Sequence, residues 1–276
     1  MAADLTGGDG EAVAPALATP APALPAAPAA ANPHRRRFLV IYTLLGGVLA
    51  AAVVGVVVFA GRSINPGPQW SAWKPHGGGL GAAKEIADQV SKDYRLPNGK
   101  QLVDVIAKAP SVSPASNLTI PIHYVAVRGT KGSGDKVYTV SSSDSVMFSL
   151  CGLGTSCSIA TGKASVQRGT LVRREILELA LYTFKYVGGI KNVIAFMPPA
   201  AGTQPKYVVY LQKGDVAAEL HTPLAQTLAA KTPQPATIPA REVRAVETAT
   251  GPRVYSFSLS QAQQGDAILV LAPIPA

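Results

Sequence analysis

The chain has 276 residues, enough for one ordinary domain with additional segments; 47% of them are hydrophobic and only 15% are charged. Its net charge of +9 falls on residues 61–276, because the three acidic residues of the first 37 are balanced by Arg35, Arg36 and Arg37 and residues 38–60 carry no charge. This surplus favours anionic neighbours but does not indicate nucleic acid, since the basic residues do not alternate with aromatic residues on which bases could stack.

Residues 1–37 consist mostly of alanine and proline. Recurrent proline prevents a stable helix, and the segment has little apolar bulk to bury. The sequence therefore predicts a disordered N-terminal tail, and the arginines at its end place it on the cytoplasmic side of a membrane.

Residues 38–60 form a run of 23 positions without a charged side chain. A helix of that length spans about 34 Å, close to the roughly 30 Å hydrocarbon core of a bilayer. The run is longer than the core of a signal peptide, and 37 residues precede it. The sequence thus predicts an uncleaved single-pass transmembrane helix in the cell membrane, with membrane lipid around it and the C-terminal domain outside the cytoplasm.

Three small residues of this segment, Gly47, Ala51 and Gly55, recur every four positions. Such a face allows two helices to approach closely in lipid. Self-association of the chain, or pairing with another membrane or envelope protein, is one interpretation. The other is chance, because alanine, glycine and valine dominate the whole segment.

A stalk rich in proline and glycine is expected over residues 61–81, and it contains Trp70 and Trp73. Two positions for these indole rings are open. They can lie among lipid headgroups, or they can fold back on the domain that follows.

The folded domain is predicted over residues 82–276. Apolar residues recur at helical spacing over 82–94, and a second, stronger helix is predicted over 170–187. Strands are predicted over 101–107, 117–127, 136–140, 192–197, 206–212, 255–260 and 267–271. Short helices are expected near 215–220 and after Pro223. Residues 231–252 are expected to form a proline- and threonine-rich connection.

These elements do not alternate regularly between strand and helix. The sequence therefore predicts an α+β extracytoplasmic domain, with a mixed or antiparallel sheet and a central buried helix, behind the transmembrane helix and the disordered tail. The helix at 170–187 has a wide apolar arc, which indicates packing on most sides, and a narrow polar face that includes Arg174, Glu175 and Glu178.

Three arginines gather near the start of this helix: Arg168, Arg173 and Arg174. Backbone N–H groups are free in a first helical turn, so this segment is a candidate anion-binding site. The alternative is that the first turn extends beyond the core and that Arg173, which projects into the apolar arc, is simply solvated.

The two cysteines, Cys151 and Cys157, stand close together in the segment CGLGTSC. Outside the cytoplasm such a pair favours a disulfide over a redox centre. A disulfide that closes so short a loop stabilises by about 2–3 kcal/mol in the chain-entropy model. Two separate buried thiols are the alternative.

No pattern in the sequence indicates a catalytic centre. His123 and His221 lack the spacing of metal ligands, and no G-x-S-x-G elbow surrounds the serines of 141–145. We therefore expect no metal site and no cofactor, and the catalytic residues of any enzyme built on this chain stay unknown.

Three segments together carry a resemblance: IADQVSKDYRLPNGKQLVDV, LELALYTFKYVGGIKNVIAFMPP and QAQQGDAILVLAP. With them the chain resembles uncharacterised single-pass membrane proteins of actinobacteria over roughly 240 residues. The resemblance implies a bacterial envelope and no particular activity.

Two functional classes follow from the sequence. The first is a non-catalytic, membrane-anchored envelope protein that binds a partner protein or an anionic envelope component. The second is a membrane-tethered extracytoplasmic enzyme whose site is assembled from residues distant in sequence. The absence of a catalytic motif and the scarcity of histidine and carboxylates favour the first class.

Overall fold

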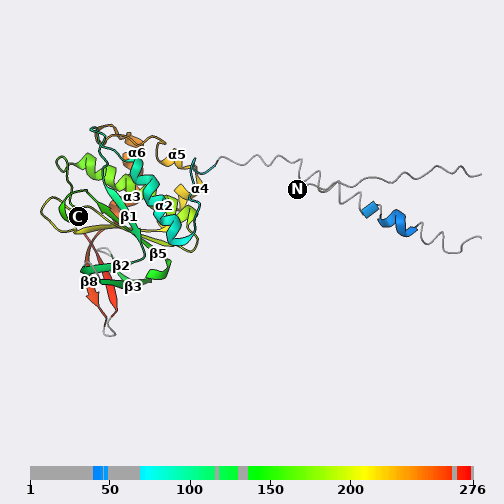
Figure 1. Cartoon of the computed structure of the whole chain (residues 1–276), viewed down its shortest axis with the longest axis horizontal. Coiled ribbons are helices and arrows are strands. Elements are labelled where there is room, and N and C mark those ends of the chain that lie inside the picture. Colours follow the sequence, from blue (N-terminus) through cyan, green and yellow to red (C-terminus); the bar gives the residue numbers. More distant parts are fainter. Residues whose placement is uncertain are drawn as a thin grey trace, which may run out of the picture. The chain divides into compact units, whose positions relative to one another are not determined.

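The computed structural model describes residues 40–45, 47–48, 69–115, 118–129, 136–262 and 266–274 (Figure 1). The chain divides into two compact units, Met1–Asn65 and Pro66–Ala276. In the first unit the described residues, 40–45 and 47–48, are helical. All the elements discussed below belong to the second unit.

The membrane part of the predicted fold class is corrected by the structure. Within the described residues, no helix combines the length and the apolarity needed to cross a membrane. Of the predicted 38–60 segment, residues 40–45 and 47–48 are described, and they are helical. The remainder of that segment, with Ala51 and Gly55 of the predicted pairing face and the tail over 1–37, lies outside the described residues.

Nine strands of the described chain form one mixed sheet in the order β1-β5-β6-β7-β8-β9-β3-β2, and β4 also pairs with β3. Their bounds are β1 Asp104–Lys108, β2 Ser111–Ala115, β3 Leu118–Arg128, β4 Val137–Ser141, β5 Ser145–Cys151, β6 Asn192–Phe196, β7 Tyr207–Gln212, β8 Val254–Gln261 and β9 Ala267–Pro273. The pairs β5–β6 and β3–β9 are parallel. The other pairs are antiparallel.

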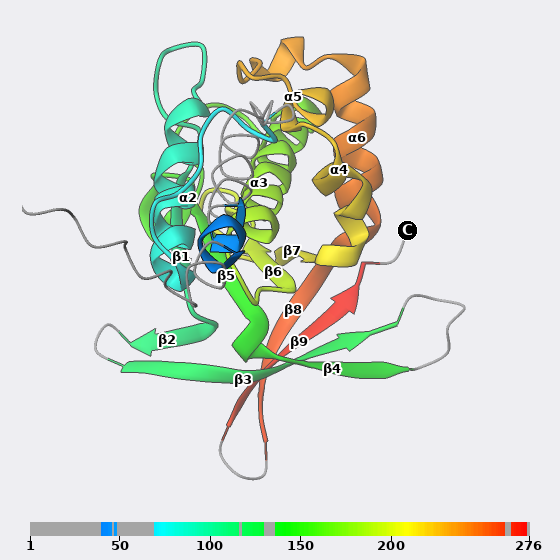
Figure 2. The ribbon, with the colours of Figure 1, turned by 90° about the vertical axis from the view of Figure 1, so that its right-hand side faces the viewer.

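The two ends of this sheet are brought toward each other by the chain. Only residues 109 and 110 separate β1 from β2, and the 3-10 helix η1 (Ser142–Asp144) joins β4 to β5. The sheet therefore curls into a nearly closed, barrel-like form; in Figure 2, β3 and β4 run across the lower part of the view and the hairpin of β8 with β9 extends below them. The predicted fold class is wrong in that it expected no closure of the sheet. The structure has the mixed sheet, but the pairing of β3 with β9, which are far apart in sequence, helps to curl it into this form.

The helices are α2 (Gly79–Asp93), α3 (Val166–Tyr186), α4 (Ala217–His221), α5 (Leu224–Thr227) and α6 (Ala240–Thr250). They lie together on one side of the sheet (Figure 2). The two long predicted helices are confirmed as α2 and α3. The connection predicted over 231–252 is wrong, because α6 lies within it. Its buried residues, Glu242, Val246, Ala249 and Thr250, recur at helical spacing, but two of the four are polar, so the buried face does not stand out as an apolar one in the sequence.

Each face of the sheet carries a hydrophobic core. The helix side buries residues such as Phe148, Leu177 and Phe184, and the interior of the barrel-like part buries others such as Val125 and Leu269. Successive residues of a strand face opposite sides, so β6 contributes Val193 to the first core and Ile194 to the second.

The two tryptophans of the predicted stalk fold back on the domain. Trp70 packs edge-on against Tyr182 and Tyr186, with ring centroids 5.5 and 5.7 Å apart, and Trp73 packs against Tyr182 at 5.6 Å. The indole Nε1 of Trp70 donates to the carbonyl of Glu219 at 3.3 Å. The structure therefore places both indole rings against the folded domain, which is the second of the two positions that the sequence left open.

Candidate functional site

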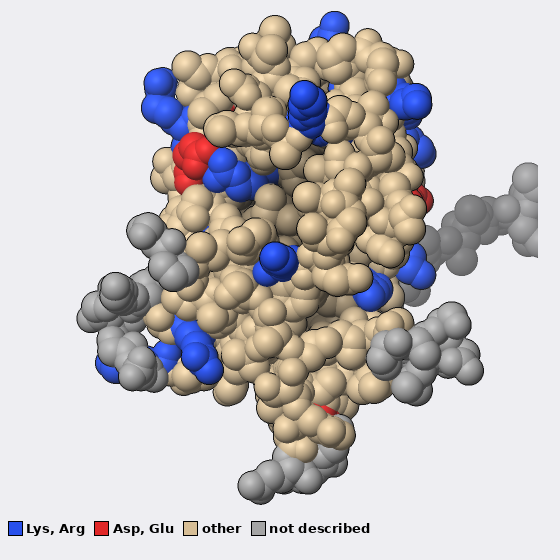
Figure 3. Space-filling view, turned by 90° about the vertical axis from the view of Figure 1, so that its left-hand side faces the viewer, with Lys and Arg blue, Asp and Glu red and all other residues tan. Residues whose placement is uncertain are grey.

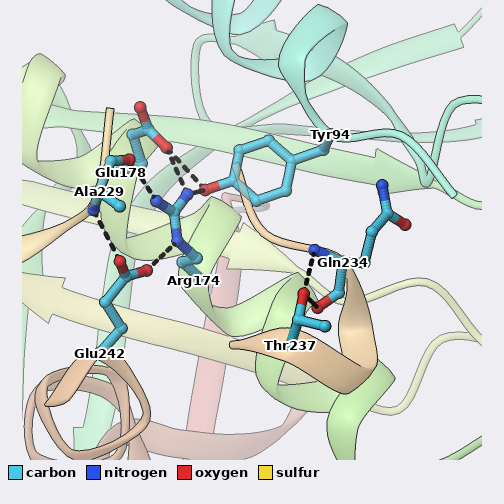
Figure 4. A network of polar contacts seen from close by, with 7 residues as sticks. All are labelled: Tyr94, Arg174, Glu178, Ala229, Gln234, Thr237 and Glu242. Atoms are coloured by element: carbon cyan, nitrogen blue, oxygen red, sulfur yellow. Dashed lines mark hydrogen bonds and ion pairs between the residues drawn. The ribbon is translucent and has the colours of Figure 1, made fainter. Parts of the chain in front are cut away.

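A group of polar side chains is buried between α2, α3 and α6, and we call Tyr94, Arg174, Glu178 and Glu242 the helix-layer cluster (Figure 4). Arg174 is fully buried, and its Nε donates to Glu242 at 2.7 Å. Its Nη1 donates to the Tyr94 hydroxyl at 2.5 Å and to Glu178 at 3.1 Å. Its Nη2 donates to the carbonyl of Ala229 at 2.8 Å, so all three nitrogens are bonded within the protein.

The carboxylates of this cluster are also bonded. Tyr94 donates its hydroxyl proton to Glu178 at 2.6 Å, and the amide of Ala229 donates to Glu242 at 2.8 Å. Burial opposes the charge of Arg174, but Tyr94, Glu178 and Glu242 outweigh it and raise the pKa of the guanidinium above its ordinary value. Because none of the four cluster residues lines a described cavity, the cluster ties the helices together and offers no ligand a free group.

Glu175 follows Arg174 in sequence, but its side chain has no hydrogen-bond partner. Its side chain is fully buried, and neither carboxyl oxygen has a hydrogen-bond partner. Burial, and then the nearby charge of Glu178, raise the pKa of Glu175 well above its ordinary value of 4.5. The predicted polar face of α3 is thus an interior face. Periodicity showed that these residues share one side of the helix, but not that α2 and α6 cover it.

The three arginines of the predicted anion site have three different sets of partners. Arg174 belongs to the helix-layer cluster. Arg173 reaches α6, where its Nη1 donates to Glu247 at 2.8 Å and its Nη2 bonds the second carboxylate oxygen. Arg168 turns back from the first turn of α3, and its Nη1 donates to the carbonyl of Thr161. The structure does not bring the three guanidinium groups together, and only Arg168 stands beside a cavity.

The cysteine segment forms a tight loop at the end of β5. Cys151 and Cys157 are joined by a disulfide, with their Cα atoms 4.3 Å apart. A Cβ at Gly152 would lie 2.6 Å from the carbonyl oxygen of Ser158, and one at Gly154 would lie 2.7 Å from it, so both positions require glycine. Three non-glycine residues of this loop have positive φ: Leu153, Ser156 and Cys157.

This loop is attached to the connection between β6 and β7. The amide of Ile159 donates to the carbonyl of Pro199 at 3.1 Å. On the other side, the amide of Met197 donates to the carbonyl of Tyr207 at 3.0 Å. The two loops, 159–164 and 197–207, are far apart in sequence, and the space between them is a cavity of about 540 Å³.

This space, which we call the loop cavity, has an apolar wall and a basic rim. Ile159, Met197 and Pro199 are among its apolar residues, and Lys206 and Tyr207 stand among the polar ones. None of the residues that line it carries a carboxylate. Its size is that of a small-ligand pocket.

A second positive charge lies directly behind the wall of the loop cavity. Gly162 lines the cavity, and a Cβ at this position would lie 2.6 Å from Nη1 of Arg168. Arg168 is buried, and its Nε has no partner within the described structure. Thr161 therefore uses only part of the bonding capacity of this guanidinium, and no carboxylate among the lining residues offsets the charges of Arg168 and Lys206.

The surplus of basic residues does not form a continuous patch on the face shown in Figure 3. The lysine and arginine side chains there are scattered over mostly uncharged surface, and one of them lies beside acidic side chains. This distribution does not favour that face as a broad site for an anionic polymer. The loop cavity is the better candidate for an acidic ligand, because there two cations stand close to an apolar space.

The histidines and the serine run take no part in these sites. His123 lies 3.7 Å from Asp266 in an exposed pair, and His221 is exposed at the end of α4; neither lines a described cavity. The serines of 141–145 form the end of β4, η1 and the start of β5. Among the residues that the structure describes, no group of three histidines, cysteines or carboxylates is placed to hold a metal ion.

Comparison with protein-family models, with curated proteins and with solved structures finds no match to this chain. The functional assignment therefore rests on the geometry of the described residues.

Proposed function

We propose that this domain is a non-catalytic binding protein and that its ligand is an anionic molecule or chain end with an apolar body, held in the loop cavity. The observation that carries the proposal is the combination, in one cavity of about 540 Å³, of an apolar wall with Lys206 and Arg168 and without a lining carboxylate.

The two parts of the cavity have different roles in this proposal. Ile159, Met197 and Pro199 supply apolar surface, and its burial contributes about 25 cal/mol per Å². Lys206 supplies a charge-assisted hydrogen bond to the acidic group, which contributes roughly 1.5–3 kcal/mol. A neutral ligand of the same shape gains the first contribution but not the second.

The disulfide supports a location outside the cytoplasm for this activity, because disulfides persist in oxidising compartments. It also has a direct structural role in the proposed site. The loop that it closes hydrogen-bonds to Ser158 and Ala160 on either side of Ile159, which in turn bonds Pro199, so it helps to hold one wall of the cavity in place.

The proposal is tested with the full chain and two probes that share an alkyl body, decanoate and decanol. We expect decanoate to shift the methyl NMR signals of Ile159 and Met197, and to bind more tightly than decanol. Lys206→Gln should weaken decanoate binding by roughly tenfold and leave decanol binding nearly unchanged. The matched control is Lys84→Gln, since Lys84 is an exposed lysine of α2 that lines no described cavity.

Two results contradict the proposal. The first is that neither probe shifts the signals of Ile159 and Met197. The second is that decanoate binding is equally strong in the wild-type chain and the Lys206→Gln variant.

A further inference from the structure

Another cavity, of about 220 Å³, is lined by three tyrosines together with Gln212, Asp215, Pro252 and Arg253. We call it the tyrosine cavity. Tyr138 comes from β4, Tyr210 from β7 and Tyr255 from β8. The rings of Tyr210 and Tyr255 meet edge to face, with centroids 6.2 Å apart, and both belong to the core inside the barrel. None of the residues that line this cavity lines the loop cavity.

Two of the three tyrosine hydroxyls remain available to a ligand. The Tyr210 hydroxyl donates to Asn192 at 2.9 Å and accepts from the Gln212 side chain at 3.0 Å. The hydroxyls of Tyr138 and Tyr255 make no hydrogen bond with any described residue. Tyr255 is only 8% exposed, but its unpaired hydroxyl is not among the fully buried atoms of the described residues, so a ligand in the cavity can reach it.

These hydroxyls are proton donors at neutral pH. Burial, and then the neighbouring Tyr138 and Asp215, raise the pKa of Tyr255 above its ordinary value. Burial likewise raises the pKa of Tyr138. A hydroxyl in this state both donates and accepts, which suits a partner that carries hydroxyl groups of its own.

The charged groups at this cavity neutralise each other. Arg253 bonds Asp215 with its Nε at 3.0 Å and its Nη2 at 3.1 Å, and its Nη1 donates to two backbone carbonyls of α6. The amide of Gln212 also donates to Asp215, at 2.8 Å. The walls therefore offer donors, acceptors and aromatic rings without a net charge, which favours neither an anion nor a cation.

We propose that the tyrosine cavity binds a neutral sugar unit, with the free hydroxyls of Tyr138 and Tyr255 bonded to the hydroxyls of the ligand. A pyranose ring combines alternating donors and acceptors with apolar C–H faces that pack on aromatic rings. The cavity has room for one such ring, and Tyr138, which is 44% exposed, stands where a longer glycan can continue into solvent.

The experiment uses the full chain with ¹³C-labelled tyrosine and a set of neutral probes: methyl glucopyranoside, methyl galactopyranoside, methyl mannopyranoside and N-acetylglucosamine. We expect at least one of them to shift the ring signals of Tyr138, Tyr210 and Tyr255 with a dissociation constant of about millimolar order, as befits a ligand of this size. Inorganic phosphate, tested in parallel, should leave these signals in place.

Two variants separate a binding role from a structural one. Tyr255→Phe keeps the ring and removes one hydroxyl, and we expect binding about fivefold weaker, the equivalent of one lost hydrogen bond. Tyr138→Ala removes an exposed ring and should weaken binding about three- to tenfold without disturbing the fold. The matched controls are Tyr124→Phe and Tyr124→Ala, because Tyr124 is an equally exposed tyrosine outside the cavity.

The proposal is overturned if none of the sugars shifts the three tyrosine signals, or if phosphate alone shifts them. It is also overturned if the Tyr124 variants weaken binding as much as the Tyr138 and Tyr255 variants do. Decanoate binding at the loop cavity is measured in the same samples, so failure of either site is seen separately from failure of the other.

Discussion

The helix-layer cluster and the tyrosine cavity are built from the same kinds of side chains, namely arginine, carboxylate and tyrosine. In the cluster, the Tyr94 hydroxyl and all three nitrogens of Arg174 are bonded within the protein. In the cavity the arginine and the carboxylate are paired, but two tyrosine hydroxyls are left over. Residue type therefore does not distinguish a structural site from a proposed binding site here; the difference is the presence of unpaired hydroxyl groups at a cavity.

The largest expected effect comes from breaking the helix-layer cluster. Glu242→Leu removes the carboxylate that accepts from both Arg174 and the Ala229 amide, so it leaves a buried guanidinium only partly compensated. We expect the free energy of unfolding to fall by about 3–5 kcal/mol in urea denaturation. Tyr255→Phe is the counterpart in the tyrosine cavity and should cost less than about 1 kcal/mol. Similar losses for the two variants would remove the distinction.

Glu175 provides an intermediate effect and a dependence on pH. Its pKa is raised in the folded chain by burial, then by Glu178, so its protonated form stabilises the fold. That stabilisation is fully present below pH 4.5 and is lost as the pH rises through the folded pKa. Glu175→Gln, which is neutral at every pH, should therefore be more stable than wild type near pH 8 by about 1–3 kcal/mol.

Denaturation curves between pH 5 and 8 test this expectation. We expect the free energy of unfolding of Glu175→Gln, relative to that of wild type, to rise steadily with pH over this range. Glu247→Gln is a useful control, because its carboxylate is half-exposed and its pKa is lowered, first by the hydrogen bond from Arg173. A stability difference between Glu175→Gln and wild type that does not change with pH contradicts a buried, protonated Glu175.

The smallest effect is expected at Arg173, which stands next to Arg174 in sequence but pairs with Glu247 near the surface. Exposed ion pairs contribute about 0–1 kcal/mol and are screened by salt. Arg173→Gln should thus cost no more than about 1 kcal/mol, with less loss at high salt. If Arg173→Gln lowered the free energy of unfolding as much as Glu242→Leu does, burial would not explain why Arg173 and Arg174 contribute differently to stability.

Local patterns in the sequence predicted most of the regular elements. The helices α2 and α3, the hairpin of β6 with β7 and the hairpin of β8 with β9 all carry clear periodicity, and each was predicted close to its observed bounds. The strand β5 was missed because a serine run leads into it. The helix α6 was missed because its buried face includes Glu242, whose partner Arg174 lies 68 residues away.

The sites were less accessible to prediction for the same reason. The sequence identified Arg168 and the cysteine pair as features of interest. It did not show that Met197 and Pro199, from a distant loop, complete the wall of the loop cavity beside them. The tyrosine cavity joins β4, β7 and β8, and no spacing in the sequence relates Tyr138 to Tyr255. Each cavity joins segments that are far apart in sequence, and local patterns do not specify such long-range neighbours.

The most direct test of the proposed binding function is to locate decanoate on the full chain by intermolecular nuclear Overhauser effects. We predict contacts from the alkyl protons of the probe to the methyl groups of Ile159 and Met197, and much weaker contacts at the same probe concentration in Lys206→Gln. Contacts that fall elsewhere on the chain, or that persist unchanged in the Lys206→Gln variant, would contradict the loop cavity as the ligand site.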